Sequence, residues 1–326
     1  MRRVLVAAAI AAPFLMGALS ASAADRDVVF RFQDPAILES SALIATGDLM
    51  VTTNDSGDSA RVFTVDPDTG ATLGTISWGG AAADVEAMAP ARGGQVWVAD
   101  IGDNLGKRHD ISVTRIPVGP ADATVSGTTY PLEFRDGPRD AEALLAHPTT
   151  GRLYVVSKGV LGGQFYVAPK TLRTAAPNRL TTLGAAPGLV TDGAFFPDGK
   201  HLVVRTYSRA VVYRFPSLEV VGTVDLPRQQ QGEGIAVAPD GRIYLSSEGV
   251  HAEVLRITLP KKIQQAMSTE PSESPTATPS EASSPGETAE SQDQGETDDP
   301  EVFPWVIGGL VGVVMLIVLV RSLRPR

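Results

Sequence analysis

The 326-residue sequence contains no cysteine and only four histidines, which are His109, His147, His201 and His251. Without cysteine, neither a disulfide bond nor thiol chemistry can contribute to this protein. None of the histidines lies in a strand–turn–helix elbow or beside an obvious nucleophile. The sequence also lacks the GxSxG and HExxH motifs and a P-loop. We therefore do not expect a conventional catalytic triad.

Basic residues are also fewer than acidic residues. The chain has 28 Lys and Arg against 37 Asp and Glu, which gives a formal net charge of -9. No basic stripe runs along the sequence, so nucleic acid is not an expected partner. The central part of the chain has no segment of helical periodicity that reaches a normal helix length. These absences favour an all-β domain with an acidic surface.

Apolar segments at the two ends indicate export and anchoring in a membrane. Residues 1–23 combine Arg2 and Arg3, an apolar stretch and an A-x-A cleavage signal, which together predict a signal peptide. Residues 303–320 are an uninterrupted run of about 18 apolar or glycine residues, long enough for a transmembrane helix. Acidic residues precede this run and arginines follow it in residues 321–326. The positive-inside rule then predicts a single-pass protein of the cell membrane, with a cytoplasmic C-terminal tail and an extracellular domain outside.

Two further regions lie between these segments. Residues 264–302 are rich in Ser, Thr, Pro and Glu and hold too little apolar surface to fold, which predicts a disordered stalk. Residues 24–263 remain for one ectodomain, a size that is normal for a closed all-β architecture.

A short motif repeats along this ectodomain: an acidic residue, a small residue and then an apolar run. The motif returns at intervals of about 40 to 56 residues, a period typical of propeller blades. Its acidic members are Glu39, Glu86, Glu142, Asp192 and Glu233. Within each repeat, β-rich runs are separated by turn residues, among them the turns at residues 148–151, 197–200 and 239–242.

The repeats predict a five-bladed β-propeller. The last repeat lacks an outer strand, whereas residues 27–32 form an alternating run that precedes the first repeat. Pairing of residues 27–32 with residues 253–258 would close the ring and protect both sheet edges. A six-bladed ring is the alternative, and it would need an additional blade from residues 117–127 or 172–188.

In a propeller, the starts of the inner strands and the ends of the second strands meet at one rim of the central channel. We therefore expect the polar side chains at these positions to converge on one channel face. The residues predicted to form this face are Glu39, Glu86, Glu142, Asp192, Glu233, Lys158, Arg205, Tyr207 and Glu248.

Several carboxylates that face each other across a narrow channel repel one another, so their charge needs compensation. A hard cation with oxygen ligands, Ca²⁺ or Mg²⁺, is one solution. Two loops of neighbouring repeats offer suitable ligands, namely Asn54, Asp55, Asp100, Asp103 and Asn104. Internal ion pairs are the other solution, because Lys158 and Arg205 could pair with the acids of the ring. Asp, Asn and Gly also dominate ordinary turns, so both explanations stay open.

Three strings carry a resemblance to a known group of proteins. They are VADIGDN at residues 98–104, RDAEAL at residues 139–144 and QGEGI at residues 231–235. With them the ectodomain resembles the uncharacterised secreted propeller proteins of actinobacteria, grouped as WD40-like or with the esterase-like activity of phytase. The resemblance implies a propeller on an exported chain, and more distantly a phytase-like, calcium-dependent relative.

The sequence thus leaves three functional hypotheses. The first is a membrane-anchored extracellular propeller that binds a ligand or protein partner through its acidic channel face, without turnover. The second is a calcium-dependent, phytase-like or lactonase-like hydrolase, in which carboxylates hold the metal and a water molecule while Lys158 and Arg205 bind the anion. The third is a structural surface protein, whose channel charges neutralise one another.

Overall fold

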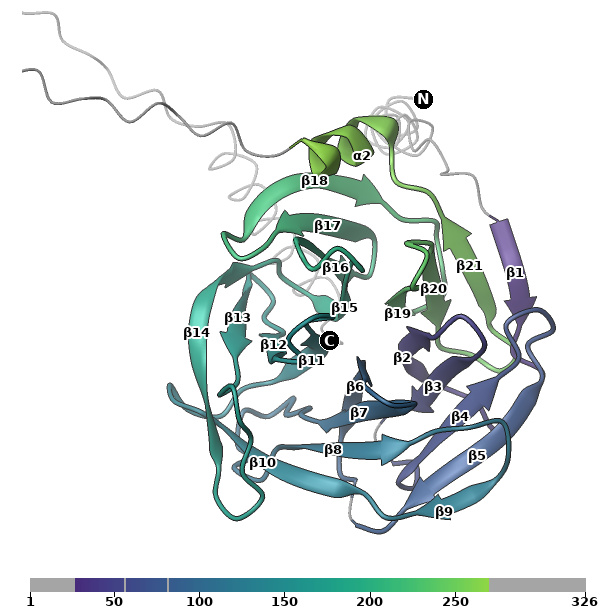
Figure 1. Cartoon of the computed structure of the whole chain (residues 1–326), viewed down its shortest axis with the longest axis vertical. Helices are drawn as coiled ribbons and strands as arrows, with labels where there is room; N and C mark the ends of the chain where they lie inside the picture. Colours follow the sequence, from purple (N-terminus) through teal and green to yellow (C-terminus); the bar gives the residue numbers. More distant parts are fainter. Residues whose placement is uncertain (1–26, 56, 81, 270–326) are drawn as a thin grey trace, which may run out of the picture. The chain divides into compact units, whose positions relative to one another are not determined.

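The computed structural model describes residues 27–55, 57–80 and 82–269 (Figure 1). The predicted signal peptide, the span at residues 303–320 and the tail lie outside these residues, as does most of the predicted stalk. Within the described part of the chain, no helix is long and apolar enough to cross a membrane.

The described part of the chain is all-β apart from one short helix at its end. In chain order the strands are β1 (Asp27–Arg31), β2 (Ser40–Ala45), β3 (Met50–Asn54), β4 (Arg61–Val65), β5 (Thr72–Trp78), β6 (Val85–Ala91), β7 (Gln95–Asp100), β8 (Ser112–Pro117), β9 (Ala123–Val125), β10 (Thr128–Phe134), β11 (Ala141–Ala146), β12 (Leu153–Ser157), β13 (Gly163–Val167), β14 (Asn178–Ala186), β15 (Val190–Phe195), β16 (His201–Thr206), β17 (Arg209–Arg214), β18 (Glu219–Asp225), β19 (Gly232–Val237), β20 (Ile243–Ser247) and β21 (Glu253–Ile257). The helix is α2 (Lys261–Ser268).

The strands pair as successive antiparallel groups. These groups run β2-β3-β4-β5, β6-β7-β8-β10, β11-β12-β13-β14, β15-β16-β17-β18 and β19-β20-β21-β1. Two parallel pairings extend them: β9 adds to the outer edge of β5, and β10 pairs with β14, which joins two groups into an eight-stranded sheet.

The groups surround a central axis, with β2, β6, β11, β15 and β19 innermost (Figure 1). Each inner strand contacts the next one, and β19 contacts β2 again, so the inner strands form a closed ring. Apolar residues that alternate on the two faces of each sheet fill the spaces between neighbouring groups as separate core clusters. Radial sheets of this kind around a closed ring of inner strands make a β-propeller.

The predicted closure by the two ends of the domain is confirmed. Strand β1 pairs antiparallel with β21, with Asp27 opposite Arg256 and Arg31 opposite Glu253. Phe30 and the following Phe32 are buried in the cluster between the last group and the first. This strand pairing and this packing close the ring within residues 27–269.

The hairpins between inner and second strands use the predicted turns. Gly151, Gly199 and Gly241 have φ of 69°, 64° and 84°, a backbone conformation that glycine adopts without the steric cost of a Cβ atom. The segments considered for a further blade are used elsewhere: β9 lies in the first of them, and β14 in the second is the fourth strand of its own group.

Helix α2 departs from the expectation for the C-terminal linker. The sequence predicts a disordered stalk from residue 264, yet the helix continues to Ser268. Ile263 is buried and Met267 is partly buried against the cluster beneath β18. Gly222 of β18 makes room for this contact, since a Cβ atom at that position would lie 2.6 Å from Ile263. Docking of two apolar side chains stabilises a helix that its own sequence signals only weakly.

Candidate functional site

Each inner strand begins with a β-bulge, where the register shifts by one residue against the second strand. The residues at these shifts are Ser41, Glu86, Glu142, Thr191 and the pair Glu233 and Gly234. A bulge takes its residue out of the regular strand alternation and re-aims its side chain. In three of the five inner strands, the acidic residue of the sequence motif is therefore the bulge residue.

The other two motif acids lie elsewhere in the register. Glu39 precedes the bulge residue Ser41 by two positions, is exposed, and forms an isolated bridge with Glu248. Asp192 follows the bulge residue Thr191 and lies opposite Arg205 of β16 in the regular register. The sequence predicts five equivalent acids at the inner strands. The structure has acids at three of these bulges, Glu86, Glu142 and Glu233, and hydroxyl residues at the other two, Ser41 and Thr191.

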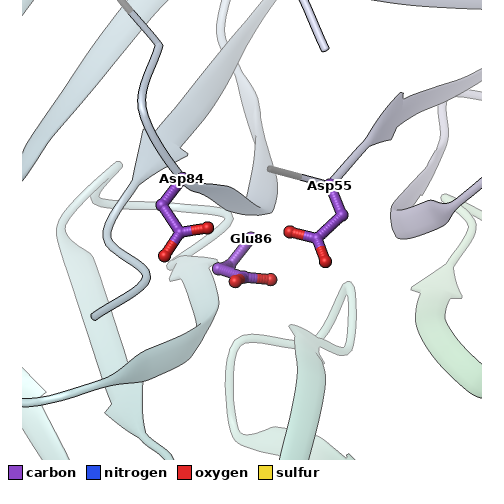
Figure 2. Close-up of side chains that lie close together, drawn as sticks. All are labelled: Asp55, Asp84 and Glu86. Carbon is purple, nitrogen blue, oxygen red and sulfur yellow. The ribbon is translucent and has the colours of Figure 1, made fainter. Parts of the chain in front are cut away.

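Three carboxylates converge at this rim from separate segments of the chain. Asp55 follows β3, Asp84 precedes β6 and Glu86 is the bulge residue of β6. Carboxylate oxygens of the three residues all lie within 4.8 Å of one another, and Figure 2 shows the side chains turned toward a common space. Asp55 was predicted as a ligand, whereas Asp84 was not; its spacing two residues before Glu86 was the available signal.

Burial decides the ionisation of this acidic triad. Glu86 is only 5% exposed, and among the described residues no hydrogen bond or ion pair compensates its carboxylate. Burial, with the charges of Glu142, Asp55 and Asp84, raises the pKa of Glu86 to about 10. Burial and the charge of Asp55 also raise the pKa of Asp84, against the opposing effect of Arg108. With protein groups alone, Glu86 therefore holds a proton at neutral pH.

Gly102 lets the backbone approach the triad closely. A Cβ atom at this position would lie 2.4 Å from Oδ2 of Asp84 and 2.7 Å from Oε1 of Glu86. The amide of Gly102 donates to the carbonyl of Asp84 at 3.1 Å. Any side chain at residue 102 would therefore displace both carboxylates.

The neighbouring acids Asp100 and Asp103 position the loops around the triad. Asp100 accepts hydrogen bonds from the amides of Ala83 and Asp84, each at 3.0 Å, and pairs with Arg108 at 2.7 Å. Asp103 accepts from the amides of Lys107 at 2.8 Å and Arg108 at 2.7 Å. Both carboxylates thus hold backbone in place.

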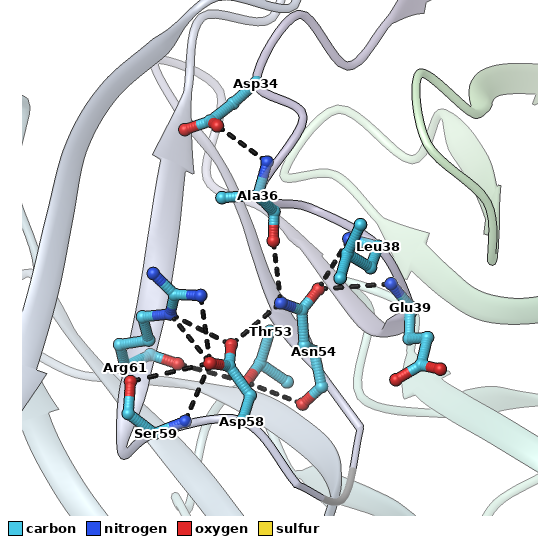
Figure 3. A network of polar contacts seen from close by, with 9 residues as sticks. All are labelled: Asp34, Ala36, Leu38, Glu39, Thr53, Asn54, Asp58, Ser59 and Arg61. Carbon is cyan, nitrogen blue, oxygen red and sulfur yellow. Dashed lines mark hydrogen bonds and ion pairs between the residues drawn. The ribbon is translucent and has the colours of Figure 1, made fainter.

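Asn54 has a similar structural role, which Figure 3 shows. Its Oδ1 accepts from the amides of Leu38 at 3.0 Å and Glu39 at 3.2 Å, and its Nδ2 donates to the carbonyl of Ala36 and to Asp58, both at 2.8 Å. These bonds use both polar atoms of the amide. Among the other residues predicted as metal ligands, Asn104 is exposed in a turn.

At one part of the rim, an internal ion pair compensates the negative charge. Lys158 pairs with Glu142 at 2.7 Å, as the alternative explanation predicts. Burial raises the pKa of Glu142 to about 8 although Lys158 opposes the shift. Burial likewise raises the pKa of Glu233 to about 7, with Lys158 acting against it and Glu248 with it. Tyr207 lies beside them, with its ring centroid 5.5 Å from Nζ of Lys158.

Asp192 and Arg205 are fully buried and connect neighbouring strands. Asp192 accepts from its neighbour Gly193 at 2.7 Å and from Ile235 of β19 at 2.8 Å. Arg205 donates through Nη1 to the carbonyls of Gly234 at 2.5 Å and Ser246 at 2.9 Å. Among the described residues, no carboxylate lies within ion-pair distance of Arg205. We therefore assign both side chains to the scaffold.

Exposed apolar side chains gather on the same rim. They lie on connections that precede inner strands or follow second strands, all of which end at this rim. They are Leu38, Leu105, Val160, Leu161, Leu189, Tyr207 and Val250. The most exposed of them is Leu161 at 101%, so the acidic centre is surrounded by apolar loop tips.

Comparisons with known proteins add no family. No protein-family model and no curated protein sequence matches the chain. Among solved structures, the chain is similar to a Bacteroides uniformis protein described as a candidate 6-phosphogluconolactonase, with 16% identity over 68% of each chain and a TM-score of 0.36. It is also similar to the β-propeller domain of Cps50 (Swd1) from Myceliophteria thermophila, with 10% identity over 72% of this chain and 100% of that domain and a TM-score of 0.41. The propeller assignment rests on strand pairing, and the actinobacterial and phytase resemblance stays a prediction.

Proposed function

We propose that the protein is an extracellular five-bladed propeller that binds a ligand or protein partner through its acidic rim, with one Ca²⁺ ion held by Asp55, Asp84 and Glu86. Each antiparallel group is counted as one blade, and β1 completes the fifth. The predicted signal peptide and the predicted span at residues 303–320 support display outside the cell.

The unpartnered carboxylate of Glu86 carries this proposal. Burial and the charges of Glu142, Asp55 and Asp84 destabilise the ionised form of this carboxyl group. Two other acids have protein partners: Glu142 has Lys158 and Asp192 has backbone amides. The charges of Asp55 and Asp84 lie beside Glu86 and raise its pKa further. A bound cation would compensate all three carboxylates at once.

The spacing of the three carboxylates fits a calcium ion. Calcium binds oxygen ligands at about 2.3–2.6 Å, so two ligand atoms on one ion are at most about 5 Å apart. One oxygen atom of each triad residue lies within 4.8 Å of those of the other two, which fits that limit. Carboxylate ligands select a hard cation, and calcium accepts irregular coordination by oxygen atoms.

The apolar loop tips support a macromolecular partner. Large exposed apolar side chains around a polar centre are typical of interaction surfaces. Leu105, Val160 and Leu161 are all more than three quarters exposed, and they come from two connections on the rim of the acidic triad, β7–β8 and β12–β13. A partner that contacts these tips would bury them and would cover the cation.

A hydrolase is the second candidate, and Glu233 favours it. Its pKa of about 7 suits a general base that takes a proton from water at neutral pH. Phosphate esters or lactones would be the substrates, with the calcium ion polarising the bond to be cleaved. Lys158 would contact the anion, although its ion pair with Glu142 limits that role.

Calcium titration of a fragment covering residues 24–271, followed by thermal melting, tests the proposal. A ligand that binds only the folded state raises the melting temperature as its concentration increases. We expect this rise for the unmodified fragment and for Asp68→Asn, which removes a distant exposed charge, and no rise for Glu86→Gln. A flat response of the unmodified fragment up to millimolar calcium would reject the cation site. Calcium-dependent turnover of a phosphate ester or a lactone would instead support the hydrolase.

A separate experiment tests whether the propeller lies outside the cell. Protease added to intact cells should cut within residues 270–299 and release the folded propeller. Protection of the propeller until the cells are lysed would contradict extracellular display.

A further inference from the structure

The end of the channel opposite the acidic triad opens into a cavity of about 730 Å³. The hairpins that connect inner and second strands surround its mouth, and all five inner strands contribute to its walls. Its volume falls within the range of small-molecule sites, about 300–1,000 Å³.

The motif of the inner strands explains why this cavity is apolar. In four of the five inner strands, an apolar residue two positions after the bulge position lines the cavity: Leu43, Met88, Leu144 and Ile235. In β15 the corresponding wall is made by Gly193 and Ala194, which are much smaller. One motif therefore builds an acidic layer at one end of the channel and an apolar layer below it, and the small residues of β15 leave space there.

The charged side chains that line the cavity are Arg92, Arg115 and Asp48. Arg115 is half-buried, with its guanidinium carbon 5.5 Å from the ring centroid of Trp97. No carboxylate of the described residues forms an ion pair with it. Arg92 donates to the carbonyl of Thr149 and has no carboxylate partner within the described ranges either. In a chain with an excess of acids, two arginines without an ion pair beside an apolar cavity point to an anionic ligand.

We infer that this cavity binds a small amphiphile, an apolar chain or ring that carries one anionic head group. The head group pairs with Arg115 at the mouth, and the apolar part lies along Leu144, Ala194 and Ile235. The reverse orientation would bring the anion toward the carboxylates at the other end of the channel. Charge at the two ends thus fixes the direction in which the ligand enters.

Quenching of Trp97 fluorescence by 2-bromodecanoate tests this inference, because its bromine lies beside the carboxylate and therefore near Arg115 and Trp97. The fragment covering residues 24–271 holds only two of the three tryptophans, and the Trp78→Phe variant leaves Trp97 alone. Trp78 does not line the cavity, whereas bromine quenches only a ring that it contacts. Neutral 2-bromodecan-1-ol, which has the same chain length, measures the contribution of the head group.

We expect saturable quenching by 2-bromodecanoate in the Trp78→Phe background. Arg115→Gln should weaken binding at least about fivefold, to the level of 2-bromodecan-1-ol. Ala194→Leu, which fills the cavity, should abolish binding, and melting curves of both variants show whether they fold. Absence of quenching at millimolar 2-bromodecanoate would overturn the inference. Equal affinity for the acid and the alcohol, or unchanged affinity in Arg115→Gln, would overturn it as well, even if Ala194→Leu does not fold.

Discussion

The Glu86→Gln substitution should stabilise the protein in the absence of calcium, although Glu86 belongs to the proposed site. Glutamine has the shape of a protonated glutamate but no proton to lose. The pKa of Glu86 is about 10 in the folded protein, against an ordinary value of 4.5. Between these two values the folded state binds a proton that the unfolded state has released. Stability conferred by Glu86 is therefore complete below pH 4.5 and declines as the pH rises.

The size of the effect follows from the same two pKa values. Each pH unit above 4.5 costs about 1.4 kcal/mol, so the penalty at pH 7 is about 3 kcal/mol. Glu86→Gln removes this penalty. For a domain of this size, 1 kcal/mol changes the melting temperature by about 2–4 °C, so the variant should melt about 6–12 °C higher at pH 7. At pH 4 the two proteins should melt at nearly the same temperature.

Thermal melting between pH 4 and pH 8, with and without calcium, is the assay. Calcium at about 100 times its dissociation constant would stabilise the unmodified fragment by about 2.7 kcal/mol and leave Glu86→Gln unchanged. Asp68→Asn serves as the control for loss of one exposed charge. If Glu86→Gln melts below the unmodified fragment at pH 7 without calcium, Glu86 has a stabilising partner and the reasoning is wrong.

Three other substitutions test separate parts of the structure. Phe32→Ala should lower the free energy of unfolding by about 3–5 kcal/mol because it empties the buried contact at the ring closure; a loss below 1 kcal/mol in urea denaturation would contradict the closure. Asp192→Ala should cost about 2–4 kcal/mol by leaving buried amides, including that of Ile235, without an acceptor, and unchanged urea denaturation would remove Asp192 from the scaffold. Gly102→Ala should weaken calcium binding at least about tenfold in calorimetry, since its Cβ would lie 2.4 Å from Asp84; unchanged affinity would place the ion elsewhere.

The sequence predicts the parts of the fold that depend on local signals. Alternating apolar residues predict the strands, and the Pro and Gly residues of the hairpins predict the turns, because each has a direct backbone cause. The pairing of residues 27–32 with residues 253–258 follows from an unpaired strand at each end of the domain. These features need no knowledge of distant contacts.

The sequence alone could not show which residue of each inner strand occupies the bulge. Glu86 and Asp192 belong to similar motifs, yet the register leaves Glu86 at the bulge and pairs Asp192 with Arg205 of β16. A shift of one residue decides whether a carboxylate faces other acids or backbone amides, and only the pairing between strands sets that shift.

Candidate metal ligands were also ambiguous in the sequence. Asp55 and Asn54 are adjacent and chemically suitable, but the side-chain amide of Asn54 is used by four hydrogen bonds, three to the segment before β2 and one to Asp58 of its own loop. Asp, Asn and Gly serve turns and cations equally well. The contribution of Asp84 depends on two segments that meet only in the folded chain.

Isothermal titration calorimetry of calcium at pH 7, in two buffers with different ionisation enthalpies, tests the central claim most directly. Metal ligands must be deprotonated to bind, and the pKa of Glu86 near 10 means that its proton has to leave. We predict one calcium ion per chain and the release of about one proton, which Glu86→Gln abolishes together with binding. Calcium binding without proton release, or no binding heat in either buffer, would contradict a cation site at Asp55, Asp84 and Glu86.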